Sequence, residues 1–274
     1  MTTKLDPLSG KEVAVYTPSP SLVDAIEAWR VANGVEKSEM HILDWGCGRG
    51  RAVLWLRAQG YQAYGVDAFA EPVENGRNFL RENGEDPAIL QVLDNKGRSI
   101  FSDGFFDFVC SDQVLEHVAD IEIVAREIAR VMAPGGGGLL IYPAQWVPQE
   151  GHLFMPFTHW LPKHSALRRW AIQAYVAAGI EPRWSALADL SPRAKAKTYT
   201  DYLNQRTFYR PVRTVARAFS RQGLTALPET VRAEKIRSSP VFSRVIRFAI
   251  LRLTLNWLLI TFRSVHLHLV RPAS

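Results

Sequence analysis

Cysteine is scarce in this chain of 274 residues: Cys47 and Cys110 are its two cysteines, and they form no CxxC pair. A disulfide framework and a cysteine zinc site are therefore not expected, and a reducing compartment is indicated. Long hydrophobic runs are also lacking, because Arg252 and Arg263 leave ten uncharged residues between them, too few to span a bilayer. The opening MTTKLDPLSG lacks the basic and apolar regions of a secretory signal. We predict a cytoplasmic protein without a transmembrane helix.

Acidic residues are few in the second half of the chain. Residues 151–274 hold 20 Lys and Arg and 5 Asp and Glu, a charge of +15, whereas residues 1–150 hold 13 and 22, a charge of −9. The two halves sum to the overall charge of +6. Such a break indicates two functional regions, of which the basic one either faces an anionic partner or is an ordinary solvated surface.

Short apolar segments alternate with amphipathic ones through the first half. Strands are predicted at residues 40–46, 61–67, 87–94, 105–112 and 137–144. Helices are predicted at residues 20–33, 51–60, 71–83 and 121–132. Strands that alternate with helices of this length favour parallel pairing in a doubly wound α/β sheet. The run from Pro134 to Gly138 is interpreted as a plain turn.

The second half is less regular. Residues 145–191 carry scattered aromatics, prolines and histidines around one predicted helix, 166–179, which is typical of an inserted substrate cap. The remaining predicted elements are a helix at 211–223, a strand at 224–233, a long apolar helix at 238–262 and a strand at 263–272.

Three alternate glycines mark the segment HILDWGCGRG, residues 41–50. Gly46, Gly48 and Gly50 lie between a predicted strand and a predicted helix, where bare backbone amides suit an anion. Asp67, 21 residues after Gly46, ends the next predicted strand, about where nucleotide-binding folds hold a ribose hydroxyl. These features together predict an adenosine-type ligand at the carboxyl ends of the first two strands.

The glycine spacing discriminates among such ligands. Dinucleotide-binding folds carry G-x-G-x-x-G, but this segment reads G-C-G-R-G and has Arg51 where the third glycine belongs. An NAD-dependent dehydrogenase is therefore kept only as an alternative.

In these residues the chain resembles the class I S-adenosylmethionine-dependent methyltransferases. The resemblance covers residues 38–144 closely, and it continues in YGVD at 64–67, in the LEHV of the stretch that begins at Ile100, and in IARVMAPGGGGLLIYP. It implies a Rossmann-like, mostly parallel seven-stranded sheet with a largely helical cap inserted after the fifth strand. The expected domains are a cofactor-binding core at 1–144, a cap at 145–208 and a C-terminal part of the core at 209–274.

The resemblance also implies site residues for S-adenosylmethionine. Asp44 would orient the ammonium of the cofactor, Asp67 would accept from its ribose hydroxyls, and Asp94 or Asn95 would lie beside the adenine. The remaining expected cofactor-binding residues come from the glycine loop and the end of the fourth strand: Gly46, Cys47, Gly48, Gly50, Ser111, Asp112 and Gln113.

S-adenosylmethionine carries an activated methyl group, so the protein must mainly align an acceptor. A hydroxyl acceptor benefits from a general base, and histidine suits that role near neutral pH. The candidates are His117, His152 and His159, each of which is otherwise an ordinary packed or surface histidine. A metal site built from His152, His159, His164 and Glu150 matches no standard ligand spacing, so no metal is predicted.

A missing sequence motif limits which acceptors are expected. Methyltransferases that modify amino groups of nucleic-acid bases typically carry Asp/Asn-Pro-Pro-aromatic after the fourth strand, where this chain has Ser111-Asp112-Gln113-Val114. We therefore expect a small-molecule, sugar or lipid-linked acceptor, methylated on a hydroxyl. Trp146, Phe154, Phe157 and Trp160 would supply apolar surface. A nucleic-acid methyltransferase and a non-catalytic cofactor-binding protein stay open as alternatives.

The predicted C-terminal helix adds one further expectation. Arg244, Arg247 and Arg252 fall on one side of residues 241–262, opposite a wide apolar surface. This pattern is typical of a helix at an anionic membrane surface, although a core helix packed on the sheet fits it equally. Loose membrane association is thus a hypothesis, and the oligomeric state stays open.

Overall fold

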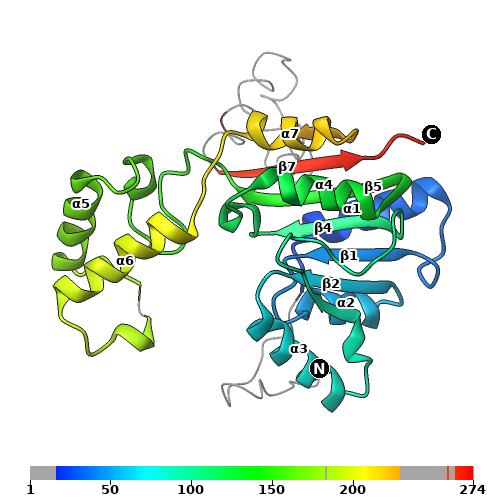
Figure 1. Ribbon diagram of the computed structural model, residues 1–274, viewed down its shortest axis with the longest axis horizontal. Helices are drawn as coiled ribbons and strands as arrows, with labels where there is room; N and C mark the ends of the chain where they lie inside the picture. Colours follow the sequence, from blue (N-terminus) through cyan, green and yellow to red (C-terminus); the bar gives the residue numbers. More distant parts are fainter. Residues whose placement is uncertain (1–16, 183, 229–257, 259–262, 274) are drawn as a thin grey trace, which may run out of the picture.

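The computed structural model describes residues 17–182, 184–228, 258 and 263–273. Its centre is a seven-stranded sheet in the order β3-β2-β1-β4-β5-β7-β6, and β7 is antiparallel to both of its neighbours (Figure 1). The strands are β1 (His41–Trp45), β2 (Gln62–Asp67), β3 (Leu90–Val92), β4 (Phe106–Asp112), β5 (Met132–Pro143), β6 (Thr225–Pro228) and β7 (Ser264–Val270). The predicted mostly parallel seven-stranded sheet is confirmed.

Helices cover both faces of this sheet. The face-covering helices are α1 (Pro20–Asn33), α2 (Arg51–Ala58), α3 (Ala70–Glu82), α4 (Ile121–Val131) and α7 (Val212–Arg221). Successive side chains of a strand point to opposite faces, so Ile42 packs in the core under α1, α2 and α3 while Leu43 packs in the core under α4 and α7. The unbroken apolar stretch in β1 reflects this burial on both sides.

Two strands begin elsewhere than predicted. Pro87–Ile89 forms a short 3-10 helix, η1, whose first turn is capped by Asp86, and β3 is shortened to three residues. β5 begins at Met132, so the interpretation of Pro134–Gly138 as a plain turn outside the strand is wrong. This run is an irregular start of β5 with a register shift against β4, and Gly135 has a φ of +79°. A Cβ on Gly137 would lie 2.4 Å from Trp29 of α1, so close helix packing explains one of these glycines.

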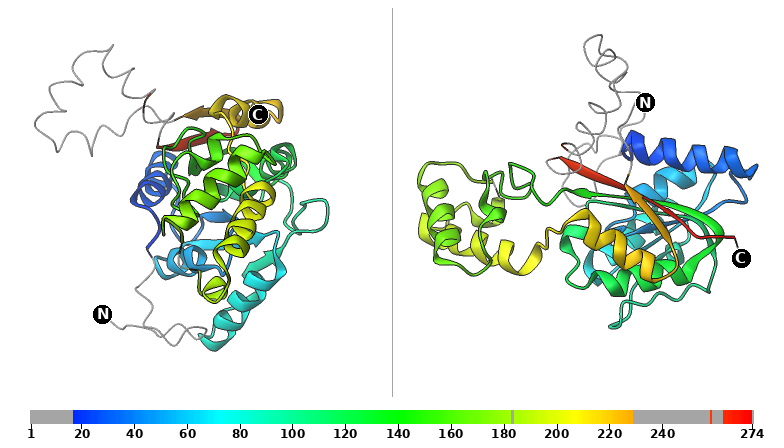
Figure 2. Two further views of the ribbon diagram at one scale, coloured as in Figure 1. Left: turned by 90° about the vertical axis from the view of Figure 1, so that its left-hand side faces the viewer. Right: turned by 90° about the horizontal axis from the view of Figure 1, so that it is seen from above.

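A helical lobe follows β5. Its two helices, α5 (Ala166–Ala177) and α6 (Pro192–Arg206), pack on each other around a small core that includes Ile172 and Leu203. The parallel strands end on the side that faces this lobe, which lies beyond the strand ends rather than over a face of the sheet (Figures 1 and 2). We did not predict α6 from the sequence, although Ser191 caps it and Pro192 begins it. Its side chains are largely polar, which weakened the helical pattern.

The long apolar helix predicted at 238–262, with Arg244, Arg247 and Arg252, lies outside the described residues apart from Leu258. Among the helices that are described, none is long and apolar enough to cross a membrane.

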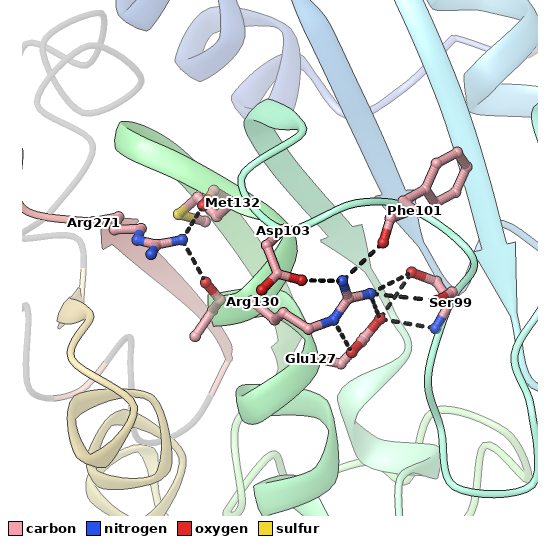
Figure 3. Close-up of polar contacts among 8 residues, drawn as sticks. Ser99, Phe101, Asp103, Glu127, Arg130, Met132 and Arg271 are labelled. Atoms are coloured by element: carbon pink, nitrogen blue, oxygen red, sulfur yellow. Dashed lines mark hydrogen bonds and ion pairs between the residues drawn. The ribbon is translucent and has the colours of Figure 1, made fainter.

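A half-buried guanidinium ties the segment before β4 to α4 (Figure 3). Arg130 donates to both carboxylate oxygens of Glu127, to Asp103 and to the carbonyl of Phe101. The Glu127 carboxylate also accepts from the backbone and hydroxyl of Ser99, both at 2.8 Å. At the same C-terminal end of α4, Arg271 donates to the carbonyls of Ala129 and Met132. These contacts fix α4 against the sheet.

We predict that Arg130→Met lowers the free energy of unfolding by about 3 kcal/mol, because it leaves a buried carboxylate unpaired. Arg81→Met is the matched control, since the ion pair of Arg81 with Glu74 is half exposed and should contribute less than about 1 kcal/mol. Urea unfolding of both variants measures the difference. An equal loss in the free energy of unfolding for the two variants would contradict this role for Arg130.

Candidate active site

A cavity of about 220 Å³ opens at the carboxyl end of β1. Its lining combines the glycine loop with the end of β4 and the start of α1, through Leu22, Asp44, Gly46, Cys47, Arg49, Arg51, Ala52 and Asp112. The cavity therefore lies where parallel α/β sheets bind ligands, beyond the carboxyl ends of the central strands.

The three glycines of the loop are required for different reasons. All have a positive φ, +81° for Gly46, +52° for Gly48 and +71° for Gly50, which favours glycine. A Cβ on Gly46 would lie 2.4 Å from Val114, and one on Gly50 would lie 2.6 Å from Leu90. A Cβ on Gly48 would meet no atom within 4 Å. Protein packing thus excludes side chains at Gly46 and Gly50, whereas Gly48 faces open space.

Asp67 holds this loop against the tip of β2. One carboxylate oxygen accepts from the backbone N–H of Gly48 and the other from that of Phe69, both at 2.9 Å. The loop also depends on Gly76 of α3, which sequence reasoning did not single out. A Cβ there would lie 2.6 Å from the carbonyl oxygen of Arg49, so a glycine inside a helix was the available signal.

Acidic and basic side chains both line the cavity. Asp44 is 8% exposed, and burial together with the charges of Asp112 and Asp67 raises its pKa to about 7. Burial also raises the pKa of Asp112. Arg49 and Arg51 line the same cavity. A cationic ligand would relieve the repulsion that Asp112 and Asp67 exert on Asp44.

The other predicted cofactor residues have varied surroundings. Ser111 is fully buried, and its hydroxyl donates to the carbonyl of Trp45, which ties β4 to β1. Gln113 has a φ of +57° directly after β4. Asp94 and Asn95 are exposed, and Asp94 accepts from the N–H groups of Lys96 and Arg98 within its own turn. A contact of either residue with adenine stays a prediction.

A second cluster of polar side chains joins the core to the helical lobe. His117 belongs to a short 3-10 helix, η2 (Leu115–His117), that follows β4, and His152 lies where the chain enters the lobe. The Nε2 atoms of the two rings are 3.1 Å apart. The Nδ1 of His117 donates to the carbonyl of Arg206, at the end of α6 (2.7 Å). Two of the three histidines predicted from the sequence are thus brought together.

Glu150 connects the segments around this cluster. Its fully buried carboxylate accepts from the Nδ1 of His152 and the hydroxyl of Tyr209, each at 2.7 Å. It also accepts from the backbone N–H groups of His152 and Leu153. Sequence reasoning considered Glu150 only as a metal ligand and missed Tyr209 entirely.

Burial and neighbouring charges shift the pKa values of the ionisable groups in this cluster in different directions. Burial lowers the pKa of His117 and raises that of Glu116 to about 7. Burial also opposes the charged form of His152, but the hydrogen bond and charge of Glu150 outweigh it, and the pKa of His152 is raised. The neutral form is therefore favoured for His117, and the protonated form is favoured for His152.

His159 does not join the two other histidines. Its ring packs against that of Tyr209, with the centroids 4.5 Å apart, and burial lowers its pKa to about 4. Within the described ranges, the one group of three side chains with metal-binding spacing is Glu116, His117 and His152. The set of His152, His159, His164 and Glu150 considered from the sequence is therefore not formed.

Comparison with known proteins agrees with the fold and the glycine loop. A family model described as a methyltransferase domain matches residues 43–140, from β1 to the middle of β5. Residues 43–140 are therefore similar to a methyltransferase domain, in agreement with the predicted resemblance to class I S-adenosylmethionine-dependent methyltransferases.

Several curated methyltransferases align with this domain. The ubiquinone biosynthesis O-methyltransferase of Rickettsia akari is 26% identical over 137 residues, which cover 44% of this chain and 53% of that protein. Methyltransferase GfsG of Streptomyces halstedii is 30% identical over 129 residues, with 44% and 46% covered. The norajmaline N-methyltransferase of Rauvolfia serpentina is 32% identical over 113 residues, with 40% and 39% covered. The chain thus spans about half the length or less of these relatives.

A solved structure extends the likeness of the fold beyond the methyltransferase domain. Phosphoethanolamine N-methyltransferase 2 of Haemonchus contortus, in complex with S-adenosyl-L-methionine, matches with a TM-score of 0.51 and 15% identity. The match covers 93% of this chain and 53% of that chain. At this identity the likeness concerns the fold alone.

We predict that Gly48→Ala weakens binding of S-adenosylmethionine about tenfold or more, because the methyl group would enter the open space beside the cavity of the methyltransferase domain. Gly34→Ala is the matched control. Gly34 also has a positive φ, +65°, and no atom within 4 Å of a built Cβ, but it ends α1 away from the glycine loop. Both variants should lose about 1 kcal/mol of stability. Calorimetric titration measures the affinity, and an equal loss of affinity in both would contradict the assignment.

We also predict that binding of S-adenosylmethionine releases a proton from Asp44. The positive ligand lowers the raised pKa of this carboxyl, so affinity should rise about tenfold between pH 6 and pH 8. Titrations in buffers of different ionisation enthalpy measure the proton release. Asp44→Asn should bind more weakly and show no such dependence, and a dependence that persists in this variant would assign the proton to another group.

Proposed function

We propose that this chain transfers the methyl group of S-adenosylmethionine to a hydroxyl of a small-molecule, sugar or lipid-linked acceptor. The main support for the proposal is the pair of His117 and His152 just beyond β4, whose Nε2 atoms are 3.1 Å apart. The same strand contributes Asp112 to the cavity. An acceptor held between the cavity and the histidine pair would have its hydroxyl beside groups that can take part in its deprotonation.

The cavity suits the charge of S-adenosylmethionine. Asp44 and Asp112 supply negative charge for its ammonium and sulfonium groups, and Asp67 lies at the tip of β2, where a ribose is commonly held. When bound, the cofactor supplies a methyl group on a positively charged sulfur, which needs no covalent nucleophile from the protein. The residues of the chain would therefore bind, orient and desolvate the reactants.

Exposed aromatic side chains favour an acceptor with apolar surface. Trp146, Phe157 and Trp160 are each more than one third exposed. The ring centroids of Trp146 and Trp160 are 5.7 Å apart, and those of Phe157 and Trp160 are 4.7 Å apart. They belong to the segment that also carries His152. Aromatic faces of this kind bind planar rings, apolar chains or sugars.

The rickettsial relative is an O-methyltransferase, which supports oxygen as the methylated atom, whereas the relative from Rauvolfia serpentina is an N-methyltransferase. Contact with an anionic membrane would depend on residues 241–262, which lie almost wholly outside the described structure. It stays a prediction.

The test is transfer of a radiolabelled methyl group from S-adenosylmethionine into a fractionated cell lysate. We expect label in the small-molecule or lipid fraction, in a product whose methyl group is found on oxygen by mass spectrometry. Asp67→Ala should abolish labelling, because it removes the carboxylate at the tip of β2. Label confined to nucleic acid would overturn the proposal, as would full activity in Asp67→Ala.

A further inference from the structure

Three side chains near the end of β4 have ligand atoms gathered around one point. The carboxylate of Glu116 and the imidazoles of His117 and His152 each offer an atom, and these atoms all lie within 4.8 Å of one another. Glu116 and His117 are neighbours on η2, whereas His152 comes from the entrance to the lobe. The group is therefore assembled by tertiary structure.

A hydrogen bond at the Nδ1 of each ring determines whether the Nε2 atom, which faces the other ring, carries a proton or a lone pair. The carbonyl of Arg206 can only accept, so the Nδ1 of His117 carries a proton. The carboxylate of Glu150 accepts from the Nδ1 of His152 in the same way. In two neutral rings, both Nε2 atoms then present lone pairs to each other across 3.1 Å. Such an arrangement is repulsive unless a proton or a metal cation lies between them.

Glu116 distinguishes these two possibilities. Its side chain is 3% exposed, and in the described structure its Oε2 atom is buried without a hydrogen-bond partner. A proton shared by the two imidazoles would leave this oxygen unsatisfied, at a cost in free energy. A cation bound by all three groups would satisfy it.

We propose that Glu116, His117 and His152 bind one divalent transition-metal ion of the zinc type. Two imidazoles favour such an ion over magnesium or calcium, which prefer oxygen ligands. Three protein ligands are typical of catalytic zinc sites, which keep a position open. The Arg206 carbonyl and the Glu150 carboxylate are the outer partners that orient metal-bound histidines.

The role of the ion rests on the proposed function, whereas its binding does not. In the open position, an acceptor hydroxyl would bind through oxygen, and the ion would lower the pKa of that hydroxyl. The proton would pass to solvent, the oxygen would form a bond to the methyl carbon, and the carbon–sulfur bond would break with its electron pair left on sulfur. The ion would thus replace a histidine general base.

The test begins with the full chain, stripped with a chelator and titrated with Zn²⁺ by calorimetry and with Co²⁺ by visible absorption. We expect one ion per chain and the absorption bands of a cobalt–imidazole site. Glu116→Gln and His152→Ala should each weaken Zn²⁺ binding about tenfold or more. His159→Ala is the matched control, because this half-buried histidine of the same segment lies outside the cluster.

Binding of S-adenosylmethionine serves as the check that each variant is folded. No Zn²⁺ or Co²⁺ binding by the folded chain, or binding unaffected by Glu116→Gln and His152→Ala, would overturn the metal site. Methyl transfer that survives complete chelation would overturn its catalytic role. Metal binding without methyl transfer to any acceptor would support the metal site but contradict the proposed function, so the two failures are distinguishable.

Discussion

The arrangement of this molecule depends on one buried carboxylate. Glu150 follows β5, where the chain enters the helical lobe, and Tyr209 follows α6, where the chain leaves it. Their hydrogen bond therefore joins the two ends of the lobe, which are 59 residues apart in the sequence. The same carboxylate orients His152. Because a buried charge is tolerated only when its hydrogen bonds are satisfied, these contacts act together. The position of the lobe and the geometry of the histidine cluster are set by the same group.

The uneven charge of the chain has two physical origins. In the first half, Asp67 and Asp112 act on the buried carboxyl of Asp44 beside the cavity, and a cationic ligand would relieve their repulsion. In the second half, part of the positive charge is structural. Arg210 donates to the carbonyls of Leu115, Val118 and Ala119, and Arg168 donates to those of His159 and Leu161. These guanidiniums satisfy loop carbonyls, so the excess of basic residues does not by itself indicate an anionic partner.

The sheet and its cofactor edge were largely predictable because their signals are local. Buried strands, helix periodicity and the glycine loop each occupy fewer than about fifteen consecutive residues, and the order of these segments implies parallel pairing. The prediction failed where local signals conflict. The glycines of Pro134–Gly138 suggested a turn, but the close approach of Trp29 and pairing with β4 and β7 hold them at the start of β5.

The sequence by itself determined the class of fold, the glycine loop, the acidic residues beside it and the histidines that could serve chemistry. Only the tertiary structure decided that His117 meets His152, that Glu116 lies buried beside them, and that His159 packs on Tyr209 instead. Loops carry no periodicity that records their partners, and contacts across 35 or 59 residues depend on how the whole chain packs. For that reason the candidate residues could be named from the sequence, but their grouping could not.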